Sequence, residues 1–250
     1  MIVDCFTFYN ELDMLEYRLT VLDKVDKFII VEARQTHSGA DKELFFEKNK
    51  LRYQKWSDKI VHIIVDKFPE TKDSWVREQY QRNDIQRGLN TLSLDDRDTI
   101  IISDVDEIVN PACLTRQYNG IYALKQDAYY YNLTCLTTTN WTHAKILNWG
   151  TYKLIGSPQV CRLGCRVSGL IEHGGWHLSF FGNTEFIRNK LQNFAHTEYS
   201  GEQFTNTRNI EDSITNCKDL NCGRPFTRVP LQDNKNLPPQ HEVLVRLFSS

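Results

Sequence analysis

Residues 99–111 read TIIISDVDEIVNP, a strongly apolar segment that runs directly into acidic residues. Three consecutive isoleucines at positions 100–102 predict a short buried strand. Asp104, Asp106 and Glu107 follow at the carboxyl end of that strand, where open α/β sheets bind their ligands. Carboxylates this close repel one another unless a cation lies among them, and Mg²⁺ or Mn²⁺ suits such oxygen ligands. Because Mg²⁺ completes its shell with substrate phosphates, the stretch predicts a metal that holds a phosphate-bearing substrate; the alternative is a solvated turn.

Strand patterns alternate with helical patterns before this stretch. Strands are predicted at residues 2–8, 28–31 and 60–65, and helices at residues 12–22, 45–53 and 75–89. Such alternation implies right-handed crossovers and a mostly parallel, Rossmann-like sheet in an α/β fold. No G-x-G-x-x-G motif is present, which argues against a dehydrogenase.

The second half of the chain is richer in strand patterns. β-Branched and aromatic residues predict strands at residues 121–124, 129–136 and 151–154. A helix is predicted at residues 184–194, with Asn183 or Thr184 as its N-cap. Before it, the glycine pair of HGGWHLSFFG at residues 173–182 predicts a turn that brings backbone close to a ligand. The polar tail from residue 205 predicts an extended surface segment with one short helix near residues 210–216.

Composition restricts the possible functions. The 250 residues carry a net charge of −2, which leaves no basic face for nucleic acid. No apolar run reaches membrane-spanning length, and the first residues do not resemble a secretory signal, so a cytoplasmic protein is expected. The seven cysteines lack zinc-finger spacing, and free thiols in a reducing compartment are their expected state.

Five short segments in a fixed order cover much of the chain. They are NELDMLEYRL after the first strand, IIVEARQTHSG at the second strand, REQYQRNDIQRGL in the third helix, ISDVDEI and GGWHLSFFG. Together they resemble glycosyltransferase family 17, and the similarity extends from residue 1 to about residue 239. The founding activity of that family is β-1,4-mannosyl-glycoprotein 4-β-N-acetylglucosaminyltransferase.

The resemblance implies a GT-A-type fold and one catalytic domain of residues 1–250. Its expected parts are a nucleotide-sugar-binding half at residues 1–110, a strand-rich acceptor and catalytic half at 111–200, and an extended C-terminal wrap at 201–250. The implied reaction is a metal-dependent, inverting transfer of N-acetylglucosamine from a UDP-sugar to a hydroxyl of a glycan or glycoprotein. Mn²⁺ or Mg²⁺ is the implied cofactor. The chain lacks the Golgi anchor and stem of the animal enzymes, so a bacterial or viral relative is expected.

The metal ligands are expected among acidic residues and histidines of these motifs. Asp104 and Asp106 are the first candidates, and Glu107 either joins them or braces Asp104. His177 beside the glycine pair completes the shell or contacts the diphosphate in the favoured interpretation, with His196 as the competing candidate. The alternative for each histidine is a structural residue that binds no metal, which is the commoner role of a lone histidine.

Donor-binding residues are expected at strand ends, in the glycine turn and on the third helix: Asn10, Glu11, Glu32, Arg77, Arg82, Asn83, Asp104 and Trp176. Each has a plainer alternative, such as a first-turn acid for Glu11 or core packing for Trp176. Arg34 and His37 lie in the loop after the second strand, where an ordinary polar loop is favoured over contact with phosphate.

An inverting transfer also needs a general base that accepts the proton of the acceptor hydroxyl. Glu172, just before the glycine pair, is the first candidate and Glu185 the second, although Glu185 also suits the first turn of a helix.

Two rival functions stay open from the residues themselves. One is a haloacid-dehalogenase-like phosphatase in which the first aspartate of the pair is a nucleophile. The other is a non-catalytic sugar-binding module that uses the aromatic side chains.

Overall fold

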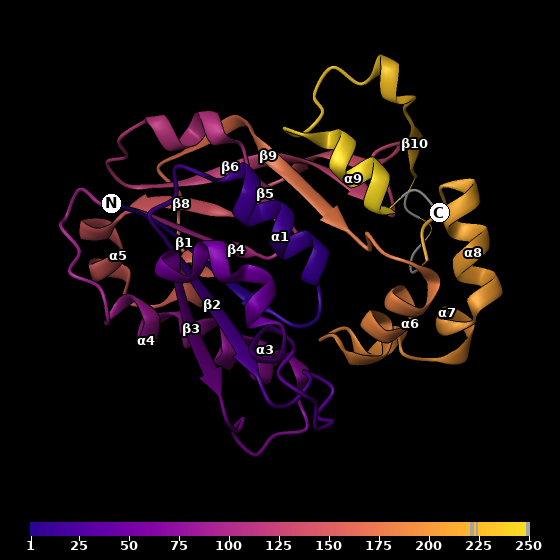
Figure 1. Ribbon diagram of the computed structural model, residues 1–250, viewed down its shortest axis with the longest axis horizontal. Helices are drawn as coiled ribbons and strands as arrows, with labels where there is room; N and C mark the ends of the chain where they lie inside the picture. The colour runs from indigo at the N-terminus through magenta and orange to yellow at the C-terminus, as the bar shows by residue number, and fades with distance from the viewer. Residues whose placement is uncertain (221–222, 224, 249–250) are drawn as a thin grey trace.

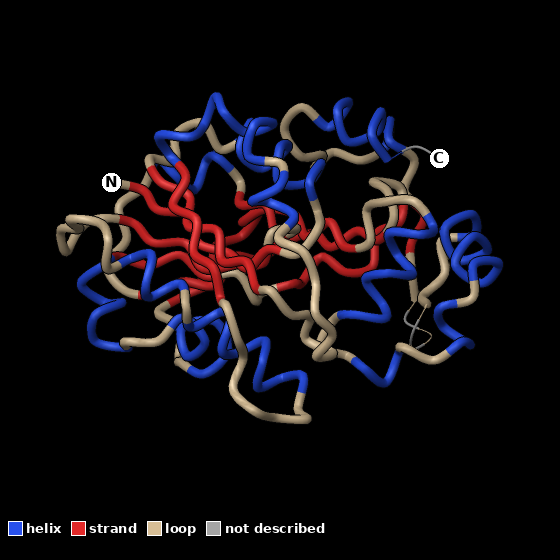
Figure 2. Tube along the Cα trace, turned by 60° about the horizontal axis from the view of Figure 1, so that its bottom comes forward, coloured by secondary structure: helices blue, strands red, loops and turns tan. Residues whose placement is uncertain are grey.

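The computed structural model describes residues 1–220, 223 and 225–248, which form a mixed sheet with helices on both faces (Figures 1 and 2). Its described strands follow the order β10-β7-β6-β8-β4-β1-β2-β3, while β9 pairs with β6 and β5 pairs with β9. The α/β class is therefore confirmed. The expected mostly parallel sheet is confirmed only for the N-terminal strands, because the second half pairs largely antiparallel.

The N-terminal strands are parallel and lie in the order β4-β1-β2-β3. Their bounds are β1 Ile2–Phe8, β2 Lys27–Ala33, β3 Ile60–Val65 and β4 Thr99–Asp104. In register, Thr7 pairs with Asp104 and Phe8 pairs with Glu32. This register brings the carboxyl ends of β1, β2 and β4 to one edge, as the alternating pattern predicted.

Helices connect these strands and cover both faces of the sheet (Figure 2). The connecting helices are α1 Leu12–Val21, α2 Phe45–Lys48, the 3₁₀ segment η1 Lys50–Lys59, α3 Ser74–Asn83 and α4 Ile85–Leu89. The leucines of α1 pack into one core cluster, and Ile85 and Leu89 of α4 pack into a second cluster on the opposite face. The single helix predicted at residues 75–89 is thus two helices, separated at Asp84.

The later strands extend the sheet beyond β4. They are β5 Glu107–Val109, β6 Ile121–Tyr130, β7 Cys135–Trp141, β8 Lys145–Asn148, β9 Gly169–Ser179 and β10 Thr227–Arg228. The predicted strand at residues 129–136 is wrong as one element, because Tyr131, with φ 67°, lies in a turn between β6 and β7. The predicted turn at residues 173–182 lies largely within β9, so the glycine pair belongs to a strand.

The predicted strand at residues 151–154 is also wrong, because that segment forms α5, Trp149–Ile155. Trp149 and Tyr152 stack with ring centroids 5.1 Å apart, and a spacing of three residues gives that contact in a helix. Tyr152 is buried against the second core cluster. Tertiary packing therefore outweighs the strand propensity of β-branched and aromatic residues here.

The remaining described helices are short. They are η2 Pro111–Thr115, the π-helical turn η3 Val160–Gly164, α6 Thr184–Asn193, η4 Thr197–Tyr199, α7 Glu202–Thr205, α8 Thr207–Asn216, η5 Leu231–Asp233 and α9 His241–Phe248. Asn183 is the N-cap of α6, as predicted, and its side chain accepts from the backbone N–H of Phe186 at 2.9 Å. Helices α6, α7 and α8 gather at one end of the molecule (Figure 1). None of the described helices is long and apolar enough to cross a membrane.

The C-terminal segment is more helical than expected. It contains α8 at the predicted position and also α9, which the sequence pattern did not indicate. Side chains of the domain hold the segment before α9: Tyr17 donates to the Pro239 carbonyl at 2.6 Å, and Trp176 donates to the Asn236 carbonyl at 2.6 Å.

The cysteines are not all free thiols. A disulfide joins Cys135, the first residue of β7, to Cys217, which follows α8. The expectation of free thiols is therefore wrong for this pair, since residues 82 apart in sequence meet only in the folded chain. Among the described residues the free thiols are Cys5, Cys113, Cys161 and Cys165; Cys222 lies outside the described residues.

Arg18 of α1 is fully buried at the centre of the parallel half. Its guanidinium donates to both carboxylate oxygens of Asp4 at 2.6 and 2.7 Å and to Ser103 Oγ at 2.6 Å. It also donates to the backbone carbonyls of Asp104, Val105 and Glu107 at 2.8, 3.1 and 2.9 Å. One buried side chain thus joins α1, β1 and the chain that leaves β4.

We predict that Arg18→Met lowers the free energy of unfolding by about 3–5 kcal/mol, because it leaves Asp4 as a buried, unpaired charge. Urea denaturation with unchanged m-value measures this loss. Arg52→Met is the control, since Arg52 pairs with Asp13 and Glu16 at the surface and its loss should cost less than about 1 kcal/mol. Equal losses in the two variants would contradict the role given to Arg18.

Candidate functional site

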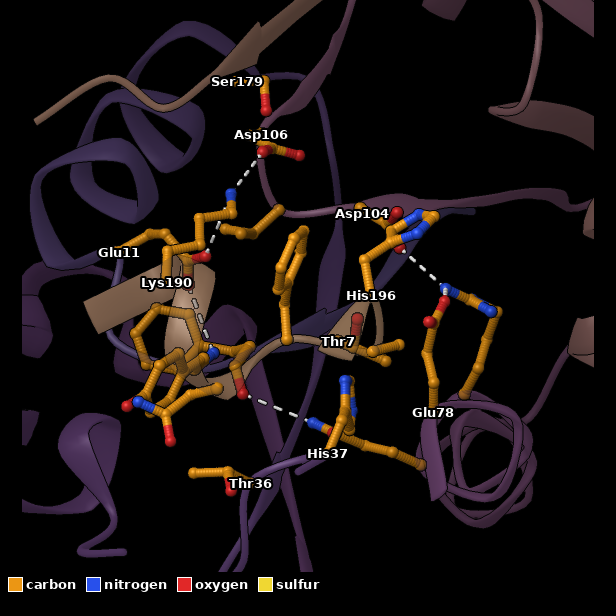
Figure 3. Close-up of a pocket in the computed structure, with 18 of the residues that line it drawn as sticks. Thr7, Glu11, Thr36, His37, Glu78, Asp104, Asp106, Ser179, Lys190 and His196 are labelled. Carbon is orange, nitrogen blue, oxygen red and sulfur yellow. Dashed lines mark hydrogen bonds and ion pairs between the residues drawn. The ribbon is translucent and has the colours of Figure 1, made fainter. Parts of the chain in front are cut away.

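A cavity of about 450 Å³ lies at the carboxyl ends of β1 and β4 (Figure 3). Its walls come from those strand ends, the loop after β2, α3, the turn η3, the end of β9 and α6. Ligand sites of open α/β sheets commonly occupy this edge, and their volumes fall in this range.

The acidic turn forms one wall of the cavity. Asp104 ends β4, Asp106 lies in the turn to β5, and Glu107 begins β5. Asp104 and Asp106 line the cavity. Asp106 is 6 % exposed and Glu107 is fully buried, so the alternative of a solvated turn is wrong.

Two arginines neutralise Asp104. Arg162 Nη2 lies 2.6 Å from Asp104 Oδ2, and Arg82 Nη2 lies 3.1 Å from Oδ1. Burial alone would raise the pKa of Asp104, but the guanidiniums of Arg162 and Arg82 outweigh it and hold that pKa well below its usual range. Asp104 is therefore ionised.

Glu107 braces this pair instead of facing the cavity. Its carboxylate accepts from Arg162 Nη1 at 2.5 Å, from Trp141 Nε1 at 2.6 Å and from the backbone N–H of Asp104 at 2.8 Å. Burial raises the pKa of Glu107, and Arg162 more than offsets that rise, so its pKa lies below the usual value. Because both carboxylate oxygens of Glu107 accept hydrogen bonds from protein donors, Glu107 orients Arg162 and Asp104.

A lysine of α6 neutralises Asp106. Lys190 Nζ lies 2.9 Å from Asp106 Oδ2 and 3.6 Å from Glu11 Oε1, between the two carboxylates (Figure 3). Burial would lower the pKa of Lys190, but Asp106 and Glu11 raise it above its usual value. Lys190 is therefore a permanent cation in the cavity wall.

His177 lies beside the acidic turn, whereas His196 lies elsewhere on the wall. His177 Nε2 is 3.7 Å from Asp106 Oδ1, and its ring stacks on Trp141 with centroids 4.1 Å apart. Its Nδ1 is buried and has no hydrogen-bond partner among the described residues. Burial lowers the pKa of His177, which favours the neutral ring. His196 lines the cavity too, but its Nδ1 bonds to Glu198 at 2.7 Å.

Asp104 and Asp106 are the carboxylates of the acidic turn that could hold a divalent cation, which would have to displace arginine or lysine from their oxygens. The described residues contain no group of three or more His, Cys, Asp or Glu side chains arranged to hold a metal ion. A Mg²⁺-type ion needs only one or two carboxylates when substrate oxygens and water complete its shell. Two carboxylates facing one cavity, with the unpartnered nitrogen of His177 nearby, would fit such an ion.

Several predicted donor-binding residues lie outside the cavity. Glu32 belongs to β2 itself and is fully buried, where it accepts from the Phe46 N–H at 3.0 Å and contacts His62 at 3.1 Å. Asn10 lies next to the wall and donates to Asn189 at 3.3 Å. Glu11 and Arg82, by contrast, line the cavity, and their role in donor binding stays a prediction.

Arg77 and Asn83 hold neighbouring loops in place. Arg77 donates to the carbonyls of His37, at 2.9 Å, and Thr71. Asn83 Oδ1 accepts from Ser157 Oγ at 2.9 Å and from the Gln159 N–H at 3.2 Å, which fixes the segment before Arg162. The helix α3 therefore supports the site through its outer residues as well as through Arg82.

Trp176 does not form a wall of the cavity. It is 3 % exposed and packs in the first core cluster, whereas its neighbour His177 lines the cavity. The two-residue period of β9 sends adjacent side chains to opposite faces, so only one of the two residues can reach the cavity.

Neither predicted general base lies in the cavity. Glu172 pairs with Lys125 at 2.9 Å, and Glu185 lies 3.9 Å from Arg188; both carboxylates are exposed. The acidic residues that line the cavity are Glu11, Glu78, Asp104 and Asp106.

Sequence reasoning missed Arg162, Lys190 and Trp141. Lys190 lies three residues after Ile187 on the buried face of α6, and a basic residue on an apolar helix face was an available signal. Arg162 lies in a single π-helical turn, for which the sequence carries no comparable pattern.

The protein is an α/β protein with a cavity at the carboxyl edge of a parallel strand group. The sequence model of glycosyltransferase family 17 matches residues 1–225 of the 250-residue chain. The chain therefore belongs to glycosyltransferase family 17 and is a glycosyltransferase, with a sugar donor and a glycan acceptor. A search of the curated proteins found no match. Family membership favours this activity over the phosphatase and the sugar-binding module.

We predict that Trp176→Phe lowers the free energy of unfolding by about 1–3 kcal/mol, because it removes a buried hydrogen bond and part of a core side chain. The Michaelis constant for the sugar donor should stay unchanged, since Trp176 faces the core. Denaturation midpoints and initial rates measure both effects, and Trp141→Phe, in the cavity wall, is the comparison. A weakened donor affinity at unchanged stability would contradict the core assignment.

Proposed function

We propose that the chain transfers N-acetylglucosamine from UDP-N-acetylglucosamine to a glycan hydroxyl, with inversion and with a divalent cation bound at Asp104 and Asp106. The sequence motifs support the donor and the stereochemistry through the family resemblance. The observation that carries the proposal is the meeting of two carboxylates with three cationic side chains, Arg82, Arg162 and Lys190, around one cavity. A diphosphate and its cation need both kinds of group within reach.

In the proposed reaction, the acceptor oxygen bonds to the anomeric carbon while the bond from that carbon to the β-phosphate oxygen breaks. The electron pair of the broken bond stays on the departing UDP. Arg82, Arg162 and Lys190 are fixed cations that can stabilise this charge as it develops. Asp104 and Asp106 would hold Mn²⁺ or Mg²⁺, which would act as a Lewis acid toward the same diphosphate.

The proton of the acceptor hydroxyl passes to a carboxylate of the cavity in this proposal. Glu172 and Glu185 are exposed and outside the cavity, which argues against both as the base. Glu11 and Glu78 are the cavity carboxylates that do not belong to the acidic turn. Glu11 also accepts from the backbone N–H groups of Tyr9 and Asn10 at 3.3 and 3.1 Å, which orients its carboxylate.

We predict that Asp106→Asn weakens Mn²⁺-dependent binding of UDP by at least about tenfold, or 1.4 kcal/mol, because it replaces a proposed carboxylate metal ligand with an amide. Calorimetric titration with UDP in the presence of Mn²⁺ measures the change. Asp212→Asn is the matched control, since Asp212 pairs with Lys218 at the surface of α8. Unchanged affinity in Asp106→Asn would remove this carboxylate from the metal site.

Lys190 and a metal ion should compete for Asp106. We predict that Lys190→Met tightens the binding of Mn²⁺ in the absence of nucleotide, because a cation 2.9 Å from the ligand oxygen is removed. The same variant should bind UDP less tightly, since a fixed cation near the diphosphate is lost. Electron paramagnetic resonance of free Mn²⁺ measures the first effect, with Lys218→Met as the control. Weaker Mn²⁺ binding in Lys190→Met would contradict the competition.

A further inference from the structure

The loop after β2 presents His37 to the cavity in a fixed position. His37 lines the cavity wall near the end of β1 (Figure 3). The loop closes on itself through the Gly39 N–H, which donates to the Thr36 carbonyl at 2.9 Å. Arg77 donates to the His37 carbonyl at 2.9 Å and ties the loop to α3. The imidazole therefore projects from backbone that is held on two sides.

The amide of Gln81 determines which ring nitrogen of His37 carries the proton. Gln81 Nε2 lies 2.8 Å from the Val31 carbonyl and 3.3 Å from the Phe8 carbonyl, and both of these groups only accept. The nitrogen side of the amide must therefore face the strands. Gln81 Oε1 then faces His37 Nε2 at 2.8 Å, and an amide oxygen only accepts. His37 Nε2 is consequently the protonated nitrogen.

The other nitrogen of this ring is left as an acceptor. Burial lowers the pKa of His37, although Glu78 and Gln81 act in the opposite direction, so the ring is neutral. A neutral ring protonated at Nε2 carries a lone pair at Nδ1. Among the described residues, the His37 ring makes one hydrogen bond, from Nε2 to Gln81 Oε1. Nδ1 is thus the polar atom that His37 offers to a ligand.

The neighbouring charges indicate which part of a nucleotide meets this lone pair. Gln81 and Arg82 are adjacent on α3 and point about 100° apart, so one helix serves two parts of the cavity. Arg82 faces the acidic turn, where a diphosphate finds its cations. A lone pair repels a phosphate oxygen, and His37 therefore suits the N–H or O–H groups of the nucleoside.

We propose that His37 Nδ1 accepts a hydrogen bond from the nucleoside of the sugar donor, with Gln81 as the positioning residue that sets the tautomer. The donated hydrogen comes from N3–H of uracil, which makes His37 selective for uridine nucleotides, or from the ribose 2′-hydroxyl, which makes it selective for ribonucleotides. At ring position 3 cytosine has a lone pair where uracil has N–H, so an acceptor there rejects cytidine nucleotides. This inference rests on the proposed function and adds His37 as a residue that recognises the nucleoside.

Calorimetry of the full chain with Mn²⁺ and three probes, UDP, CDP and 2′-deoxy-UDP, tests the proposal. His37→Phe keeps an aromatic ring and removes the acceptor, so UDP affinity should fall about two- to tenfold. If uracil donates, the preference for UDP over CDP is lost in this variant. If the ribose 2′-hydroxyl donates, the preference for UDP over 2′-deoxy-UDP is lost. His241→Phe, on α9 and outside the cavity, should preserve both preferences.

Unchanged UDP affinity and unchanged preferences in His37→Phe would overturn the inference and leave the proposed function intact. Absence of UDP binding by the wild type would overturn both.

Nitrogen-15 NMR of the His37 ring is a second readout that does not depend on a variant. The wild type should be protonated at Nε2, and its Nδ1 resonance should shift on addition of UDP. Protonation at Nδ1, or no shift with bound UDP, would overturn the proposal.

Discussion

The buried ion pair of Arg18 with Asp4 is the interaction on which the site depends. A carboxylate and a guanidinium without solvent are tolerable only when further hydrogen bonds satisfy them, and here Ser103 and three backbone carbonyls of the acidic turn do so. Those carbonyls belong to the chain that carries Asp104 and Asp106. The pair therefore holds the backbone of this turn at the strand end from which Asp104 and Asp106 line the cavity.

Charge balance is the second constraint. The acidic turn would repel itself in isolation, and the protein compensates with cations from distant segments: Arg82 from α3, Arg162 from η3 and Lys190 from α6. Each cation is held by at least one further carboxylate or amide, so the charges are arranged before any ligand arrives. Preorganised charge of this kind costs little reorganisation when a substrate charge develops. A metal ion that binds Asp104 or Asp106 must replace one of these ion pairs, and a phosphate that binds the arginines or Lys190 must do the same.

The sequence predicted the parts of the fold that local patterns determine. The strands at residues 2–8 and 60–65 have the predicted bounds, and Asn183 caps α6, because apolar runs and capping side chains act over a few residues. The carboxyl-edge position of Asp104 and Asp106 followed from the strand before them. Membership of family 17 was also accessible from five motifs.

What the sequence could not supply depends on long-range packing. Whether Trp176 or His177 faces the cavity depends on the register of β9, and the neighbouring strands β5 and β6 determine that register. Glu32 followed an apolar run but lies inside β2, where His62 of β3 contacts it. Cys135 is joined to Cys217 across 82 residues, and Arg162 of η3 pairs with Glu107 across 55 residues. Such contacts leave no local pattern.

The most direct test of the account is calorimetric titration of the wild-type protein with UDP, once with Mn²⁺ and once with a chelator. If Asp104 and Asp106 bind a cation that shares the diphosphate with Arg82, Arg162 and Lys190, UDP binds much more tightly with Mn²⁺ than without it. Equal UDP affinity under both conditions would contradict the central claim.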